Sequence, residues 1–212
     1  MALPPFVAAV LLLAAALGWT FALLSWVAWE RWFESPRARH ARLERRGAGK
    51  GGPDLLDVLG FGIPAVVPAA LAIDGLLGSR WVFYSPAWSL FFPRSEVIQT
   101  IGAALLLVAL LLFTSGAYLT GKYVFSKVSE ERKLLRTGPY RFVRHPIYLA
   151  FGMLAVGYIL LALNYLAFPC LVLLFNWGWR AEDEELAKQY GDEYLEYRSR
   201  TGAFLPRFRR HT

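Results

Sequence analysis

Apolar residues fall in long uninterrupted blocks, unlike the short periodic runs of a soluble domain. Three blocks reach the ~20 residues that an α-helix needs to cross the hydrocarbon core of a bilayer. They comprise residues 5–29, 55–78 and 97–119. Two shorter blocks, residues 147–163 and 165–179, are separated only by Asn164 and predict a tight helical hairpin. The pattern therefore predicts an all-α, polytopic membrane protein with about five transmembrane helices.

The segment after residue 179 is polar and has a helical period. Its apolar side chains recur at spacings of four, four and three, which places them on one face of a cytoplasmic helix. They are Leu186, Tyr190, Tyr194 and Tyr197. Gly191 interrupts the pattern and predicts a bend or a join. We divide the chain into an N-terminal three-helix transmembrane part, residues 1–120, and a C-terminal part, residues 121–212, which contains the hairpin and the cytoplasmic helix.

The net charge of +7 is concentrated in alternate polar segments. Of the 23 Lys and Arg residues, seven lie in each of the segments 30–54, 121–146 and 180–212. By the positive-inside rule these segments are cytoplasmic, the N-terminus is outside and the C-terminus is inside. The alternation is typical of an integral membrane protein and argues against nucleic acid as the partner of the basic residues.

Two isolated residues carry little chemistry. Cys170 is the only cysteine and lies in an apolar block, so the sequence predicts no disulfide and no cysteine-based metal site. Asp74 lies near the outer end of the second block. An acid at membrane depth is a functional candidate, but its place close to the surface favours an interfacial position.

One polar stretch, residues 138–148, is dense in prolines, cations and tyrosines and reads Gly-Pro-Tyr-Arg-Phe-Val-Arg-His-Pro-Ile-Tyr. Proline disfavours helical geometry in the residue before it, so Gly138 and His145 should be extended or turn-like. A helix should then restart at Pro146. The positive end of that helix would face outward beside Arg144 and could hold an anion. The alternative is a cytoplasmic anchor at lipid headgroups.

A second polar cluster, Glu182 and Asp183, follows the predicted hairpin. Because a hairpin returns the chain to the side that it left, this acidic pair is expected to meet Arg144 and His145. A zwitterionic ligand could be clamped there, its carboxylate on the helix N-terminus and Arg144 and its cationic groups on the acids. The alternative is a salt-bridge network that only stabilises the hairpin. The residues alone do not separate the two interpretations.

The two clusters form paired motifs. They are Gly138-Pro139-Tyr140-Arg141-x-x-Arg144-His145-Pro146-x-Tyr148 and Glu182-Asp183-x-x-Leu186-x-x-x-Tyr190-Gly191-x-x-Tyr194-x-x-Tyr197. At this separation they resemble the isoprenylcysteine carboxyl methyltransferase and phospholipid methyltransferase family, and the similarity covers roughly residues 120–208. The resemblance implies an integral membrane enzyme that binds S-adenosylmethionine in its C-terminal part. The family usually has Glu-Glu at Glu182-Asp183 and often Phe-Gly at Tyr190-Gly191.

The resemblance and the predicted clamp together give a set of expected cofactor-binding residues. They are Tyr140, Arg144, His145, Pro146, Tyr148, Glu182 and Asp183. Methyl transfer from a sulfonium is an in-line displacement, which an enzyme accelerates mainly by aligning donor and acceptor. A carboxylate acceptor needs no general base, whereas an amine must lose a proton, for which Glu182 is the nearest candidate. Arg180 and Lys188 could position an anionic acceptor, with membrane anchoring as the alternative role.

The acceptor is expected to be lipophilic and to enter from the bilayer. A prenylated thiol-bearing molecule, a phospholipid amine and a small hydrophobic thiol or acid all fit. Membrane sterol and enone reductases are the alternative family, because they have a similar C-terminal region that binds NADPH and a motif closer to Lys188-Gln189-Tyr190-Gly191. Those reductases generally have more transmembrane helices than the five predicted here, which argues against that family. A non-enzymatic membrane scaffold is the third hypothesis.

Overall fold

The computed structural model describes residues 5–33, 69–70, 72–74, 76–77, 95–123, 134–165 and 179–207. The second apolar block and the second arm of the predicted hairpin lie largely outside these residues. The described elements are α1 (Pro5–Phe33), α4 (Ser95–Tyr123), the 3₁₀ turn η1 (Gly138–Arg141), α5 (Pro146–Ala162), α7 (Trp179–Tyr190) and α8 (Asp192–Arg200). This confirms the all-α prediction for the described part of the chain, in which Val143 and Gly202 form an isolated β-bridge and no strand is assigned.

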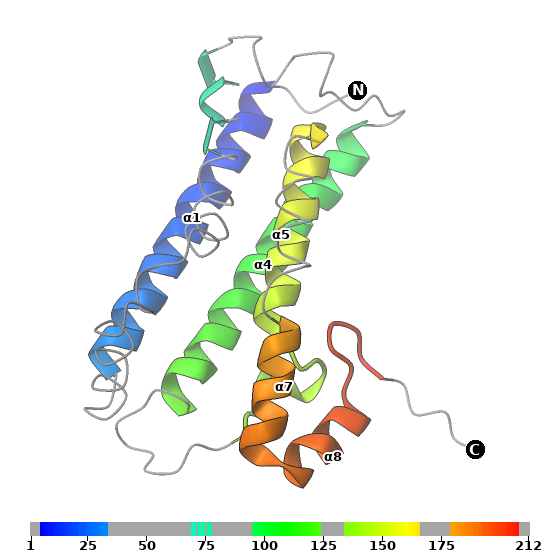
Figure 1. The fold of residues 1–212 in the computed structure, drawn as a ribbon. Helices are drawn as coiled ribbons and strands as arrows, with labels where there is room; N and C mark the ends of the chain where they lie inside the picture. The colour runs from blue at the N-terminus through cyan, green and yellow to red at the C-terminus, as the bar shows by residue number, and fades with distance from the viewer. Residues whose placement is uncertain are drawn as a thin grey trace.

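Helices α1, α4 and α5 lie side by side, and α7 continues beyond the lower end of α5 before α8 turns away (Figure 1). Helices α1 and α4 have 29 residues each, a length of about 43 Å at the usual helical rise. Among the described residues, Ser95–Lys122 is long and apolar enough to cross a membrane, whereas Val7–Phe21, the part of α1 whose side chains are described, and Pro146–Ala162 are shorter apolar stretches. The predicted topology of about five crossings therefore stays a prediction.

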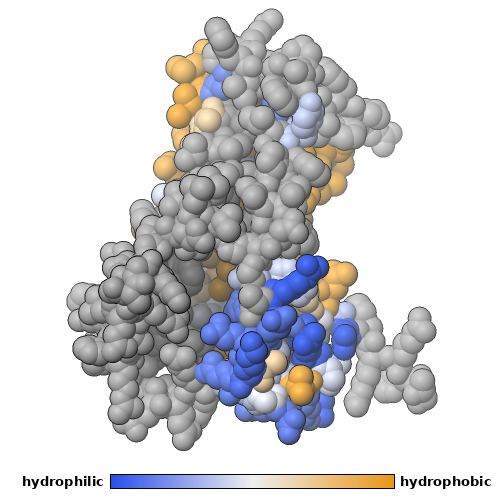
Figure 2. Space-filling model, viewed as in Figure 1, coloured by the Kyte–Doolittle hydropathy of each residue, from blue (hydrophilic) through white to orange (hydrophobic). Residues whose placement is uncertain are grey.

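An aromatic core joins the three long helices. Trp19 of α1, Phe113 of α4 and Phe151 of α5 are buried, with ring centroids 4.4 to 5.9 Å apart. Large apolar side chains also cover the outer faces of α1 and α4. They include Val10, Leu17, Phe21, Ile101, Leu107 and Leu111. Hydrophilic surface gathers over the polar C-terminal helices, and apolar surface shows mainly in the upper part of the molecule (Figure 2). Such a division suits a protein whose helices are solvated by lipid. Asp74 is buried, and its interfacial position stays a prediction.

Helices α4 and α5 approach each other closely at two glycines. A Cβ atom on Gly102 would lie 2.6 Å from the backbone nitrogen of Leu161, and one on Gly157 would lie 3.0 Å from the carbonyl oxygen of Gly102. Beside this contact, Gln99 Nε2 donates a buried hydrogen bond of 2.9 Å to the carbonyl oxygen of Leu161. That carbonyl belongs to the last turn of α5, where the carbonyl oxygens have no hydrogen-bond donor within the helix. Small residues allow such close packing between membrane helices.

Gly102→Val is expected to lower the free energy of unfolding by about 1–3 kcal/mol or more, because the added side chain meets backbone atoms that cannot move aside. The midpoint of thermal unfolding in detergent measures the effect. Gly18→Ala is the control, since its new Cβ atom would lie 3.5 Å from the Leu110 side chain, an ordinary contact. An unchanged midpoint for Gly102→Val would contradict the close approach of α4 and α5.

Gly191 separates α7 from α8, which confirms the predicted join. Its φ is 54°, a left-handed conformation that glycine adopts without strain. The predicted C-terminal cytoplasmic helix is thus two helices, α7 and α8, which meet at this join. Tyr194 and Tyr197 of α8 are buried, whereas Leu186 and Tyr190 of α7 are half-buried. These four side chains therefore belong to two helices and do not form one continuous face.

Candidate functional site

The two polar clusters meet at the N-terminal end of α5. Pro146 is the first residue of α5 and His145 is its N-cap, with φ −122° and ψ 64°, which confirms the predicted restart of the helix. The ring of His145 lies 5.8 Å from the ring of Trp179, the first residue of α7. After α5 the chain therefore comes back to the N-terminal end of that helix, as the hairpin prediction requires. We call this place the corner: it comprises the start of α5, the start of α7 and residues 201–205.

Asp183 is the centre of the charged groups at the corner. Its Oδ1 accepts a hydrogen bond of 3.1 Å from Arg144 Nε, lies 2.9 Å from His145 Nε2 and accepts a hydrogen bond from the Tyr194 hydroxyl. Its Oδ2 accepts a hydrogen bond of 3.3 Å from Arg144 Nη2 and lies 3.4 Å from Arg198 Nε. Only 5% of the side chain is exposed. Asp183 thus joins the start of α5 to both α7 and α8.

These contacts keep Asp183 ionised. Burial raises the pKa of its carboxyl group, but hydrogen bonds from Tyr194, Arg144 and His145 outweigh burial and lower the pKa below the ordinary value of 3.8. A buried guanidinium needs such a charged partner, because an unpaired charge in a dry environment is strongly unfavourable.

Acid is expected to destabilise the protein through Asp183. Because its pKa is lower in the folded state, the unfolded state takes up the proton first as the pH falls. The stability that Asp183 contributes is complete above about pH 4 and is lost as the pH falls further through the lower pKa of the folded state. Tyr194→Phe removes one hydrogen bond that lowers the pKa, so its unfolding midpoint should fall less steeply below about pH 4. Parallel midpoint curves for the two proteins between about pH 6 and pH 3 would contradict this assignment.

Arg144 is engaged on all sides by protein groups. Besides its two contacts with Asp183, its Nη1 donates to the carbonyl oxygen of Arg198 at 3.3 Å and to that of Thr201. Only 7% of its side chain is exposed. The predicted meeting of opposite charges therefore occurs, and its geometry matches the salt-bridge interpretation for Arg144 and Asp183.

The backbone of the corner is held by residues 201–205. The amide of Arg144 donates to the carbonyl oxygen of Gly202 at 2.9 Å, and the amide of His145 donates to that of Ala203 at 3.1 Å. A Cβ atom on Gly202 would lie 1.8 Å from the carbonyl oxygen of Leu205, so this turn requires glycine. Two amides beside the predicted anion site are thus already bound to protein carbonyls.

Within the acidic pair, Asp183 is buried and the carboxylate of Glu182 is accessible to solvent. Its side chain is 48% exposed, and its Oε2 lies 3.9 Å from His145 Nδ1. It also interacts electrostatically with the hydroxyl groups of Tyr140 and Tyr148. The ring of His145 therefore has a carboxylate on each side, Asp183 at Nε2 and Glu182 at Nδ1. The gap at Nδ1 is too long for a direct hydrogen bond, and a donor group placed between the two atoms could bond to both.

Aromatic rings surround His145. Its ring centroid lies 5.7 Å from that of Tyr148, 5.8 Å from that of Trp179 and 6.1 Å from that of Phe204. The rings of Trp179 and Phe204 are 5.1 Å apart. Sequence reasoning missed Trp179 and Phe204 as site residues. The position of Trp179, three residues before Glu182, could have indicated it, whereas Phe204 lies outside any periodic pattern and had no local signal.

Tyr140 connects η1 to α4 and α8. Its hydroxyl lies 2.9 Å from the Thr120 hydroxyl, and its carbonyl oxygen accepts a hydrogen bond of 2.6 Å from the Tyr197 hydroxyl. Burial raises the pKa of Tyr140 to about 12 and that of Tyr197 to about 12. Both hydroxyl groups therefore keep their protons at neutral pH and can act as hydrogen-bond donors.

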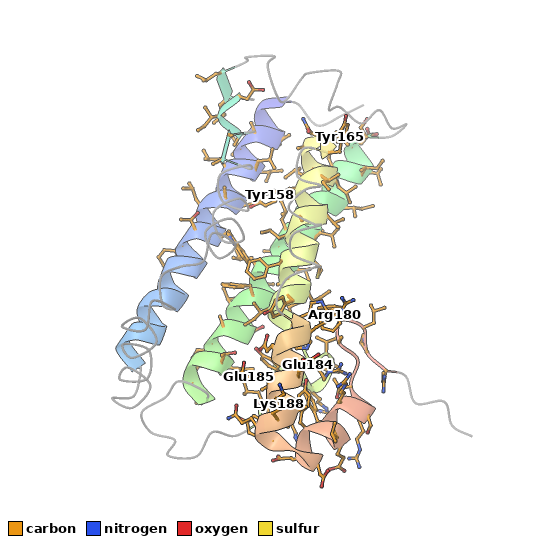
Figure 3. The ribbon with its side chains drawn as sticks, viewed as in Figure 1. Tyr158, Tyr165, Arg180, Glu184, Glu185 and Lys188 are labelled. Atoms are coloured by element: carbon orange, nitrogen blue, oxygen red, sulfur yellow. The ribbon has the colours of Figure 1, made fainter. Side chains whose placement is uncertain are left out.

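Arg180 and Lys188 are both exposed on α7, and they lie apart along the helix (Figure 3). The guanidinium of Arg180 lies 5.1 Å from the ring centroid of Trp179, so it borders the aromatic side of the corner. Lys188 follows eight residues later, about 12 Å further along the helix. The structure thus places Arg180 at the corner and Lys188 near the far end of α7.

Comparison with known proteins supports a common origin for the central part of the chain. Residues 97–188 match the model of the isoprenylcysteine carboxyl methyltransferase family. The chain is 33% identical over 87 residues to protein-S-isoprenylcysteine O-methyltransferase of Saccharomyces cerevisiae, covering 39% of this chain and 36% of that protein. It is 27% identical over 164 residues to the Rattus norvegicus protein of the same name, covering 66% and 56%.

A bacterial relative extends the comparison. The chain is 32% identical over 68 residues to methanethiol S-methyltransferase 1 of Bradyrhizobium diazoefficiens, covering 32% of this chain and 24% of that protein. The chain spans less than two thirds of the length of all three relatives. The segment that matches the family model contains the first motif, residues 138–148, and the beginning of the second, Glu182-Asp183-x-x-Leu186. The similarity of this chain to the isoprenylcysteine carboxyl methyltransferase family thus rests on residues 97–188.

Proposed function

We propose that the chain is an integral membrane methyltransferase that uses S-adenosylmethionine and acts on a lipophilic acceptor. One observation carries the proposal: the accessible Glu182 carboxylate lies beside the His145 ring at an aromatic corner, with Glu182 Oε2 3.9 Å from His145 Nδ1, inside the segment that matches the family model. The apolar faces of α1 and α4 support a membrane location. The distribution of basic residues supports a cytoplasmic corner, with the N-terminus outside and the C-terminus inside.

The corner offers a partner for each charged group of S-adenosylmethionine. An ammonium can donate to both the Glu182 carboxylate and His145 Nδ1. A sulfonium can lie against the faces of Trp179 and Tyr148, because aromatic faces attract cations. The ligand carboxylate can bind at the N-terminus of α5, the positive end of the helix dipole, which begins at Pro146. When bound, the cofactor supplies an electrophilic methyl group.

The other predicted cofactor-binding residues have supporting roles in this proposal. Tyr140 fixes η1 against α4 through its hydrogen bond with Thr120. Arg144 and Asp183 hold the start of α5 against α7, and their side chains are only 7% and 5% exposed. Burial of this pair favours an indirect action on the ligand, whereas Glu182 is placed to touch it.

The acceptor is proposed to be a lipophilic molecule that ends in a carboxylate, a thiol or an amine. Methyl transfer requires the accepting atom to be aligned with the donor. A carboxylate acceptor needs no general base, whereas a thiol or amine must lose a proton, for which Glu182 is the nearest acceptor. Arg180, beside Trp179, is placed to pair with an anionic acceptor. Lys188 would do so only for an acceptor that extends along α7.

Thermal unfolding of the detergent-purified full chain tests the cofactor, because a ligand that binds only the folded state raises the unfolding midpoint. We expect S-adenosylmethionine and S-adenosylhomocysteine to raise it and NADPH to leave it unchanged. A rise with NADPH alone would replace the proposal by the reductase alternative. No rise with any of the three would favour the scaffold.

The acceptor can then be identified with methyl-labelled S-adenosylmethionine. An N-acetylated prenylcysteine, a phospholipid amine and a small alkyl thiol represent the three chemical classes, and each is supplied in detergent micelles with the purified protein. Label in a base-labile ester indicates a carboxylate acceptor, and label in a volatile thioether indicates a thiol. Absence of transfer to all three, with donor binding intact, would contradict the proposed range of acceptors.

A further inference from the structure

The contact between Asp183 and His145 determines which nitrogen of the imidazole carries the proton. His145 Nε2 lies 2.9 Å from Asp183 Oδ1. An ionised carboxylate can only accept hydrogen bonds, so Nε2 must be the donor in this pair. An uncharged imidazole has one N–H group and one lone pair. The lone pair is therefore on Nδ1, the nitrogen that faces Glu182 at 3.9 Å.

We propose that Asp183 is a positioning residue that fixes the Nε2–H tautomer of His145 and so presents the Nδ1 lone pair to the ligand beside Glu182. The identity of the ligand rests on the proposed methyltransferase function. The tautomer does not, because it is a property of the protein without ligand.

The tautomer decides what the corner can recognise. With the proton on Nε2, Nδ1 and Glu182 are two adjacent acceptors, and a ligand that carries several N–H donors can satisfy both. With the proton on Nδ1, the imidazole would instead present a donor beside Glu182, and the pair would no longer offer two acceptors to a ligand. Asp183 thus keeps the corner selective for a donor-rich cationic group such as a primary ammonium.

Asp183 is itself held in place from two helices. Arg144 approaches it from the start of α5, and Tyr194 and Arg198 approach it from α8. The carboxylate therefore cannot rotate away from His145 without losing several other contacts. This rigidity distinguishes Asp183 from Glu182, whose carboxylate is half exposed on the other side of the same ring.

The direct test is nitrogen NMR of the full chain labelled with ¹⁵N-histidine in lipid bilayers. The chain has three histidines, and the spectrum of His145→Ala identifies the signals of His145. We expect one tautomer at neutral pH, with a protonated Nε2 and an unprotonated Nδ1. A proton on Nδ1 alone, or on both nitrogens, would overturn the proposal, whether or not any variant of Asp183 folds.

Two variants connect the tautomer to ligand binding. Asp183→Asn is expected to give a mixture of tautomers and to weaken S-adenosylhomocysteine binding about tenfold or more, as the loss of an orienting partner commonly does. Tyr194→Phe is the matched control, because it removes a hydrogen bond to the same carboxylate and leaves its charge. It should keep the single tautomer and bind within about threefold of the unmodified protein. A single Nε2–H tautomer in Asp183→Asn would overturn the role of Asp183.

The two proposals fail in different ways. If the unmodified protein has the expected tautomer but binds neither S-adenosylmethionine nor S-adenosylhomocysteine, the proposed function is wrong and the assignment of Asp183 stands. If both ligands bind and the proton lies on Nδ1, the assignment of Asp183 is wrong and the methyltransferase proposal stands.

Discussion

Glu182→Gln is expected to weaken S-adenosylmethionine binding about tenfold while the protein remains folded. The substitution keeps the size of the side chain and removes its charge, so an ammonium would lose a charge-assisted hydrogen bond. Such bonds contribute about 1.5–3 kcal/mol, and the lower end applies because the Glu182 side chain is 48% exposed and screened by water. A loss of about 1.4 kcal/mol corresponds to a tenfold change in Kd. Isothermal titration calorimetry in detergent measures it directly.

The controls for Glu182 lie on the same helix. Glu184 and Glu185 are exposed on α7, and both are visible in Figure 3. Their replacement by Gln removes one charge from the same helix without touching the His145 ring, so binding should stay within about twofold. Equal losses for all three variants would show that the helix acts through its total charge, and the specific role of Glu182 would be wrong.

Arg144→Ala is expected to have the largest effect on stability. The substitution leaves the Asp183 carboxylate buried without its main partner and frees the carbonyl oxygens of Arg198 and Thr201. Breaking one half of a buried ion pair costs about 3–5 kcal/mol. We expect α8 and residues 201–205 to separate from the start of α5 first, because Arg144 links them. Hydrogen exchange of the backbone amides, followed by mass spectrometry, would locate the loss.

Arg200→Ala provides the comparison for Arg144. Its guanidinium pairs with Glu196 at 2.6 Å, but 72% of its side chain is exposed. Exposed pairs of this spacing contribute about 0.3–0.5 kcal/mol, so this variant should unfold close to the unmodified protein. Similar exchange in the two variants would mean that burial does not strengthen the Arg144 pair, and the central role of Asp183 would be lost.

Local rules predicted some features of the corner well. Proline restricts its own φ and the residue before it, and these restrictions placed the start of α5 at Pro146 and the non-helical cap at His145. The positive φ of Gly191 likewise follows from the freedom of glycine, and it marks the join between α7 and α8. These features depend on one or two neighbouring residues, so the sequence contains them directly.

Features that depend on contacts between residues far apart in the sequence could not be predicted from such local rules. Glu182 and Asp183 are adjacent, and the sequence gives both the same charge, yet neighbouring residues on a helix point about 100° apart. The packing of α7 against the start of α5 and against α8 determines that Asp183 is buried and Glu182 exposed. Phe204 illustrates the same point, because its ring contacts His145 although no periodic pattern surrounds it. The number of membrane crossings and the orientation of the termini stay predictions.

The pairing of the corner backbone with residues 201–205 has a consequence for biosynthesis. Arg144 Nη1 and its acceptor, the Thr201 carbonyl oxygen, are separated by 57 residues. At ordinary translation rates of about 5–20 residues per second, the ribosome needs roughly 3–11 s to make that interval. The start of α5 therefore leaves the ribosome with its amides and guanidinium still exposed. A nascent chain stalled before residue 201 would therefore have a corner that cannot yet close.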